Sequence, residues 1–518
     1  MRGPRPAGAS VWVVPAFGLA AVLPLWSGDF PPLTDLPQHA AQISILRHWR
    51  DPACGYPDLY QIWWLTPNGL AYALAWALSW LMSVTTALRV VLSLAVLALA
   101  LATARLAREV GGDPWWGLLM LPLAYGFPMS FGFLGFVVAA PGVVALLGPG
   151  LRYARAPTLA RGLGLGLACA ALFFAHILAL VFALILLSGL VVAEAPALRT
   201  WPRRLAPFLL ALPLPFAWWW QTSRAPVAPA LGILYLGGFD RLWELPSVMT
   251  GLPDRRWAAL AVALLLASLA AARPRFTRAR ARWLPFAATL AIVLLAPNYT
   301  TGVSYLAPRF GYYLFPTLIF ALERREIPAE RGRSRAPLAA VALLLAVGVE
   351  LRFLGMAREG EGLAGVLAAA PAGGRLLYLA YDRGSRYSND TPFLHSGMLY
   401  AVERCGVAER TFARGYQQPV RYRPGRVEPL PDLIEYAPYR FRWDQHGGAG
   451  FDLFLVRSAG APDLARIAGG QGRLALRAHA GRWWLYRNVA GAAAERGAPA
   501  GSPGSGLRPP DLERLAPK

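Results

Sequence analysis

Lysine is almost absent from this chain of 518 residues: Lys518 is the single lysine, and the other basic residues are arginines. Acidic residues are scarce as well, 29 against 51 basic residues, which leaves a formal net charge of +22. The arginines gather between apolar stretches and near the tail, not in a compact patch mixed with aromatic residues, so we expect no nucleic-acid partner. Anionic lipid headgroups and the positive-inside rule account for them instead.

Cysteine is equally rare, with three residues in the chain. Cys169 lies in an apolar stretch and is expected to be inert. Cys54 and Cys405 are expected on the same side of a membrane, where they either form a disulfide or remain apart, because bridging requires α-carbons that lie close together. The chain also lacks internal repeats and heptad arrays.

Long apolar runs, in contrast, are abundant. The chain is 56% hydrophobic with a mean hydropathy of +0.39. Such runs predict a mainly α fold, a polytopic bundle of transmembrane helices, since a spanning helix needs about 20 apolar residues. The apolar segments are 11–27, 66–83, 87–107, 115–150, 161–193, 205–221, 257–272, 283–296, 308–322 and 337–354.

Arginine placement predicts the orientation of the bundle. Two arginine-rich stretches, 273–282 and 324–335, mark cytoplasmic ends, and Arg2 and Arg5 favour a cytoplasmic N-terminus. The first span is expected to be retained, because no small-residue cleavage site follows it. This scheme gives about eleven spans and puts 297–307 and everything after 355 outside. It also puts Arg105 and Arg108 outside, where they would reach the headgroups by snorkelling or bind an anionic lipid.

A change of composition near residue 356 predicts a second part of the chain. We divide it into a transmembrane core, 1–355, whose first outer loop is 28–65, an extracytoplasmic α/β domain, 356–490, and a disordered tail, 491–518. Strands are expected at 374–380, 451–456 and 482–487, with helical potential at 396–413.

The first outer loop carries two carboxylates, Asp29 and Asp35, next to an apolar span. Carboxylates beside a bilayer suit acid/base chemistry, and partial burial raises the pKa of such a group. Asp35 has an alternative role, because aspartate before a helix with proline in its first turn is a common N-cap. Both roles stay open at this stage.

His39 follows Asp35 by four residues and so shares its helix face. It is expected either to orient the base or contact a phosphate, or to be an ordinary packed side chain. Asp35 and His39 supply two metal ligands with no third at recognisable spacing, so we expect no metal and no other cofactor. His176, in an apolar block, is expected to be a packed residue with a backbone carbonyl or tyrosine as partner, and Gly162 and Gly166 are expected to serve close helix packing.

Three groups of residues carry a resemblance: Thr34–Ala40, Tyr125–Gly126–Phe127 with Phe131–Phe136, and Phe174–Ala175–His176. Together with the first outer loop, the many-helix core and the soluble C-terminal part, they resemble the GT-C superfamily of integral-membrane glycosyltransferases, within an uncharacterised bacterial group. The chain lacks a DxD or WWD-type signature, which argues against the oligosaccharyltransferase branch.

The resemblance implies a bacterial inner-membrane enzyme that takes a sugar from a polyprenyl-phosphate donor. It would transfer the sugar, with inversion, to a glycan, lipid or protein acceptor on the outer face, among membrane lipids. An acidic residue early in the first loop acts as general base in that superfamily; Asp35 matches best and Asp29 second.

The leaving phosphate needs a cation, and guanidinium binds phosphate in a bidentate manner. Arg309 begins a span at its outer end, where charge rules do not call for arginine, and is our first choice; its alternative is a snorkelling anchor in a tyrosine belt. Arg47 and His48 in the first loop are further candidates.

Two other functions compete with a transferase. A lipid or polysaccharide transporter or flippase would place charges and broken helices near mid-membrane and show inverted repeats, neither of which the sequence displays. A non-catalytic scaffold would bind a partner through the outer domain.

Overall fold

The computed structural model describes residues 13–223, 233–235, 238, 240–300, 303–324, 335–426, 430, 434–469 and 472–489. Several predictions fall outside these residues: the disordered tail 491–518, the orientation signal of Arg2 and Arg5, and the cytoplasmic arginines Arg325, Arg331 and Arg333.

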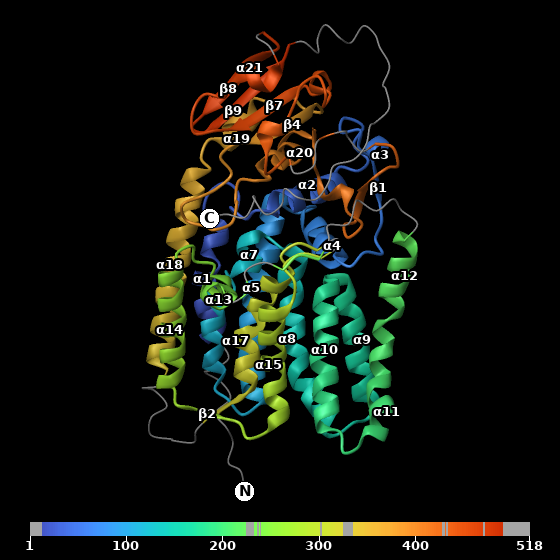
Figure 1. Ribbon diagram of the computed structural model, residues 1–518, viewed down its shortest axis with the longest axis vertical. Coiled ribbons are helices and arrows are strands. Elements are labelled where there is room, and N and C mark those ends of the chain that lie inside the picture. The colour runs from blue at the N-terminus through green and yellow to red at the C-terminus, as the bar shows by residue number, and fades with distance from the viewer. Residues whose placement is uncertain are drawn as a thin grey trace.

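Long helices form an upright bundle below a smaller mixed layer of strands and helices (Figure 1). Four helical segments are long and apolar enough to cross a membrane: α5 (Val84–Glu109), α8 (Leu134–Arg155), α10 (Ile177–Glu194) and the stretch Ala336–Ala368, which holds α18 (Ala336–Glu359) and α19 (Leu363–Ala368). The rest of the bundle is shorter or interrupted, so the count of eleven spans stays a prediction. It comprises α1 (Val13–Ala21), α9 (Leu159–Ala175), α12 (Pro213–Thr222), α13 (Asp240–Thr250), α14 (Arg255–Ala271), α15 (Leu284–Leu295) and α17 (Leu314–Phe320).

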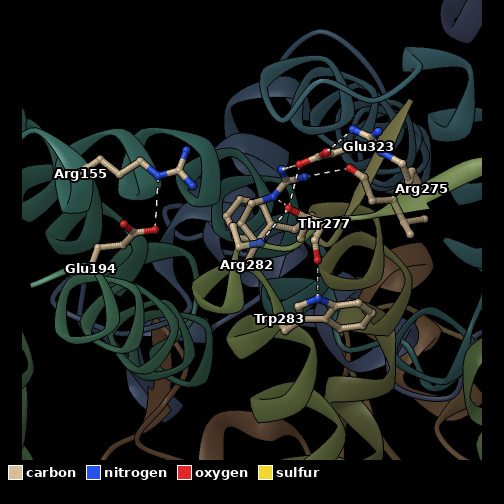
Figure 2. Close-up of polar contacts among 10 residues, drawn as sticks. Arg155, Glu194, Arg275, Thr277, Arg282, Trp283 and Glu323 are labelled. Atoms are coloured by element: carbon tan, nitrogen blue, oxygen red, sulfur yellow. Dashed lines mark hydrogen bonds and ion pairs between the residues drawn. The ribbon is translucent and has the colours of Figure 1, made fainter. Parts of the chain in front are cut away.

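The arginine-rich stretches meet at the end of the bundle that lies away from the C-terminal strands. Strand β2 (Pro274–Phe276) pairs antiparallel with β3 (Leu322–Arg324). Glu323 accepts from Arg282 at 2.6 Å and pairs with Arg275 at 3.5 Å (Figure 2). Their common location confirms that both stretches mark one side, as the arginine pattern predicted.

The expected outer location of Arg105 and Arg108 is wrong. They end α5, and the backbone N–H of Arg324 in β3 donates to the carbonyl of Gly111 just beyond that helix at 3.0 Å. The physical reason is α4 (Gly69–Leu78), which was counted as part of a span. Its ten residues measure ~15 Å against a hydrocarbon core of about 30 Å, and it packs against α2 (Leu36–Arg47).

The C-terminal part contains a five-stranded sheet in the order β5-β4-β7-β9-β8. Strand β4 (Arg375–Ala380) is parallel to β5 (Val407–Ala408) and β7 (Leu453–Arg457), whereas β9 (Trp483–Asn488) is antiparallel to β7 and to β8 (Leu474–Ala480). The three predicted strands are thus confirmed as β4, β7 and β9. The region 396–413 is only partly helical: α20 (Leu399–Arg404) precedes β5.

The first outer loop is joined to this C-terminal part in three ways. Strand β1 (Tyr60–Ile62) pairs antiparallel with β6 (Val420–Tyr422). Gln42 of α2 exchanges hydrogen bonds with the backbone of Val420. Cys54 and Cys405 form a disulfide with their α-carbons 5.1 Å apart, so the pairing that the sequence left open is present.

Two packing expectations have clear outcomes. A Cβ on Gly162 or Gly166 of α9 would meet Pro207 at 2.7 and 2.2 Å, which confirms their role in close approach. His176 lies at the break between α9 and α10 and caps α10, its Nδ1 accepting from the backbone N–H of Leu178 at 3.1 Å. Its partner is therefore a backbone donor and not the expected carbonyl or tyrosine.

Candidate functional site

Helix α2 carries Asp35 at its N-terminal end, between the bundle and the C-terminal sheet (Figure 1). The helix begins where the sequence predicts, at Leu36 with Pro37 in the first turn. The carboxylate of Asp35 makes no capping hydrogen bond, although the residue occupies the N-cap position. Its side chain is therefore available for another partner, and it is 6% exposed.

That partner is His395, 360 residues away in the chain. Its Nδ1 lies 3.1 Å from Oδ1 of Asp35 and 3.1 Å from the backbone carbonyl oxygen of Thr34. Burial opposes the charged imidazolium, but the hydrogen bond and negative charge of Asp35 outweigh burial and raise the pKa of His395. A buried carboxylate and imidazole thus form a coupled acid/base pair.

A turn after α7 (Phe127–Phe131) holds Asp35 in place. The backbone N–H of Asp35 donates to the carbonyl of Phe131 at 2.9 Å. Gly132 follows with φ +86°, and a Cβ there would lie 3.0 Å from the backbone nitrogens of Asp35 and Leu36. Only glycine combines this left-handed conformation with so close an approach, which explains the glycine in this motif.

His39 lies on the same helix but is fully engaged. Its Nδ1 is 2.6 Å from the hydroxyl of Tyr72 and its Nε2 is 3.1 Å from the carbonyl oxygen of Gly132. Burial lowers the pKa of His39 to about 4, against the opposing charge of Asp35. A neutral imidazole held by two partners serves to fix α2 against α4 and the Gly132 turn.

A second carboxylate, Asp390, lies near this pair. Desolvation, with a smaller contribution from the charge of Asp35, raises the pKa of Asp390 to about 7, although the cation of Arg352 opposes the shift. Arg352 is buried in α18, where it donates to the carbonyls of Gly251 and Tyr125. The site therefore holds two carboxylates in different environments, one paired with a histidine and one protonated up to near-neutral pH.

Arg309 faces this group from α16 (Leu306–Arg309), and its charge interacts with that of Asp35. Its guanidinium lies 3.5 Å from the ring centre of Phe133 and donates to the backbone carbonyls of Ser304 and Tyr305. These bonds use two of the five N–H groups of a guanidinium. The other three have no hydrogen-bond partner among the described residues, which leaves them available to an anion.

Tyrosines and a further arginine surround Asp35. Tyr299 and Tyr305 have ring centres 5.1 Å apart, and both interact electrostatically with Tyr436. Arg383 donates to the carbonyl of Tyr436 at 3.0 Å, and its buried Nε has no partner among the described residues. The surroundings of Asp35 are thus aromatic and cationic, a combination that suits a sugar phosphate.

The structure does not bring the other predicted site residues here. Asp29 is exposed, and its backbone carbonyl accepts from Arg89. Arg47 lies ~18 Å along α2 from Asp35, with its guanidinium 3.8 Å from the ring centre of Trp80. His48, one residue further, interacts with Ser44.

A metal site gains no support from the described residues. The grouping of possible ligands found there consists of Asp51, Cys54 and Cys405, and the two cysteines are joined in the disulfide. Metal ions bind cysteine as a thiolate, and the two sulfurs of a disulfide are not thiolates.

Sequence reasoning missed His395, Asp390, Arg352 and Arg383. One of them carried a usable signal: Arg352 is an ionisable residue inside the apolar segment 337–354, where a charge needs a partner or a function. The other three lie in the polar stretch after β4, and no local pattern links them to Asp35.

Comparison with known proteins supports the fold. No family model matches the chain, and no curated protein matches it. Among solved structures, ArnT from Cupriavidus metallidurans in the apo state is similar, with a TM-score of 0.57 and 13% identity over 93% of this chain and 98% of that one. The chain therefore shares the overall polytopic fold of that structure.

Proposed function

We propose that this protein is a membrane glycosyltransferase of GT-C type. It takes a sugar from a polyprenyl-phosphate donor in the bacterial inner membrane and transfers it, with inversion, to an acceptor on the outer face. The acceptor is a hydroxyl-bearing glycan, lipid or protein. The observation that carries the proposal is the buried Asp35–His395 pair, set at the end of a GT-C-type bundle with Arg309 beside it.

Inverting transfer requires a base on the acceptor side and a cation on the donor side. The base in this proposal is the pair of Asp35 and His395, and the carboxylate of Asp35 has no competing role as a helix cap. Arg309 is the cation for the leaving phosphate. Three of its guanidinium N–H groups have no partner among the described residues, and its charge interacts with that of Asp35. The expected alternatives, Asp29 and Arg47 with His48, lie away from this arrangement.

The location of these charges favours a transferase over a transporter. Helix α2 lies between the bundle and the C-terminal sheet (Figure 1). Asp35 occupies the N-cap of this helix, pairs with His395 and interacts electrostatically with Arg309. A transporter would concentrate its binding charges at mid-height among broken helices.

The test uses purified protein in liposomes with a panel of radiolabelled polyprenyl-phosphate sugars, and measures release of polyprenyl phosphate. We expect Asp35→Asn to lower turnover by about 10²–10⁴-fold, because the base loses its charge. Asp58→Asn is the matched control, since Asp58 is an exposed carboxylate of the same loop. Release of polyprenyl phosphate by Asp35→Asn at the wild-type rate would remove the catalytic assignment. If the wild type released polyprenyl phosphate from none of the donors, the proposed function would be removed.

A further inference from the structure

We propose that the proton of the acceptor hydroxyl passes to Nε2 of His395, and that Asp35 is a positioning residue that acts through this histidine. The inference rests on the proposed function and deepens it, because it assigns the atom that receives the proton. It follows from the hydrogen bonds that His395 makes.

Nδ1 of His395 must carry a hydrogen. Both atoms within 3.1 Å of it, Oδ1 of Asp35 and the carbonyl oxygen of Thr34, are acceptors. A neutral imidazole bears one proton, so Nε2 is then the unprotonated nitrogen. Nε2 has no hydrogen-bond partner among the described residues, which leaves its lone pair available.

His39 provides an internal contrast. Both of its ring nitrogens have partners in the protein, the Tyr72 hydroxyl and the Gly132 carbonyl. Both histidines make edge contacts with the Phe412 ring, with centroid distances of 5.4 Å for His39 and 5.8 Å for His395. Of this pair, only His395 combines an oriented ring with a free nitrogen.

The charged groups around His395 favour its protonated form during the reaction. Asp35 and Glu435 are negative and stabilise an imidazolium, as does the carbonyl dipole of Thr34. The nearby His39 opposes it only when charged, and its lowered pKa keeps it neutral above about pH 4. The imidazolium that forms when His395 takes a proton is therefore stabilised by the residues that orient it.

The acceptor oxygen forms a bond to the anomeric carbon as its proton moves to Nε2 of His395. The bond between that carbon and the phosphate oxygen of the lipid breaks, and the oxygen leaves with the electron pair. His395 returns its proton to solvent after the products separate.

The first experiment reads the tautomer of His395 directly. Protein labelled with ¹⁵N-histidine in micelles is examined by NMR between pH 5.5 and 8.5, and the signal of His395 is identified by its loss in His395→Gln. We expect the Nδ1–H tautomer for His395. A neutral ring with the proton on Nε2 would overturn the proposal, because no lone pair would then face the acceptor.

The second experiment measures the pH dependence of polyprenyl-phosphate release. The active form has a neutral His395, so activity should fall as pH drops through a value above 6.5. Loss of the Asp35 charge lowers the pKa of His395. The acid limb in the residual activity of Asp35→Asn should therefore lie at a lower pH than in the wild type. Because Asp390 titrates near pH 7 as well, Asp390→Asn must keep the limb in place.

His395→Gln should lower turnover by about 10²–10⁴-fold, while His479→Gln, at an exposed histidine of β8, should retain it. A His395→Gln enzyme with wild-type turnover and an unchanged acid limb would overturn the proposal and leave the proposed function intact. The tautomer of the wild-type protein decides the question if His395→Gln does not fold, since the signal is then assigned with variants of the other histidines.

Discussion

The position of Asp35 depends on Gly132, a neighbour that has no side chain. The turn at Gly132 touches the backbone at the start of α2, and its carbonyl also binds His39. Residue 132 therefore controls both the position of the carboxylate and the seating of the helix that carries it. The chemistry of one residue here rests on the conformation of another, nearly 100 positions away.

Gly132→Ala should damage this arrangement. A methyl group would lie 3.0 Å from the nitrogens of Asp35 and Leu36, and the backbone has φ +86°. The strain is worth about 1–3 kcal/mol, so we expect a lower thermal midpoint in micelles and weaker release of polyprenyl phosphate. Gly164→Ala in α9 is the control, because nothing lies within 4 Å of its added Cβ and alanine favours a helix. Equal midpoints for both variants would show that the turn is not strained.

Residue-scale prediction from the sequence succeeded where the signal was local. Asp35 follows an apolar span and precedes a proline-started helix, so its neighbourhood indicated a role. His395 has no such neighbourhood: its relation to Asp35 arises only when segments 360 residues apart fold together. Pairings of this kind depend on tertiary packing, which one sequence does not reveal.

At the scale of elements, α2 and α20 lie side by side and run in the same direction, with links at both ends; we call this pair the clamp. Asp35 occupies the N-cap position of α2, and His395 occupies that of the 3-10 turn Ser396–Met398, which leads into α20. The chain after each helix leads to Cys54 and Cys405, which form the disulfide. Ser44 donates to the carbonyl of Ala401 between these two links. A hydrogen bond at one end and a covalent bond at the other thus hold the two helices in register.

Reduction of the disulfide should loosen this clamp. It closes a long loop, 351 residues by separation, and loss of a native disulfide typically costs ~2–5 kcal/mol. We expect dithiothreitol to lower the thermal midpoint of the wild type and of Cys169→Ala, and to have no effect on the Cys54→Ala/Cys405→Ala double variant. An unshifted wild type, with reduction verified by electrophoresis after a protease cut between the cysteines, would contradict the clamp.

Prediction of elements failed where a segment was short or two-faced. Strand β8 was not predicted from the sequence, because most of its residues are exposed and Arg477 and His479 interrupt its apolar pattern. Helix α4 was predicted as a span because its apolar stretch continues into Trp80, Leu81 and Met82. Buried strands such as β7 were found readily, since every one of its residues lies in the core.

On the scale of the whole molecule, charge is distributed unequally between the two ends. The β2–β3 ribbon and the ends of α5 and α8 bring arginines together at one end, and the site lies at the other. This polarity predicts that the arginine-rich end faces the cytoplasm and that the C-terminal domain is extracytoplasmic.

Single cysteines introduced into Cys169→Ala protein test this orientation in intact cells and in inverted vesicles. Arg278→Cys and Gly460→Cys are exposed positions at the two ends. A membrane-impermeant maleimide should label residue 460 from the outside of cells and residue 278 only in inverted vesicles. Labelling of residue 278 in intact cells, and of residue 460 only in inverted vesicles, would reverse the topology and remove the proposed acceptor side.

The disulfide has a consequence for biogenesis. Cys54 leaves the ribosome 351 residues before Cys405, which at about 5–20 residues per second is ~20–70 s of synthesis. During that interval Cys54 has no disulfide partner, and α20 is not yet beside helix α2. The disulfide therefore cannot form until the segment that holds Cys405 has been synthesised.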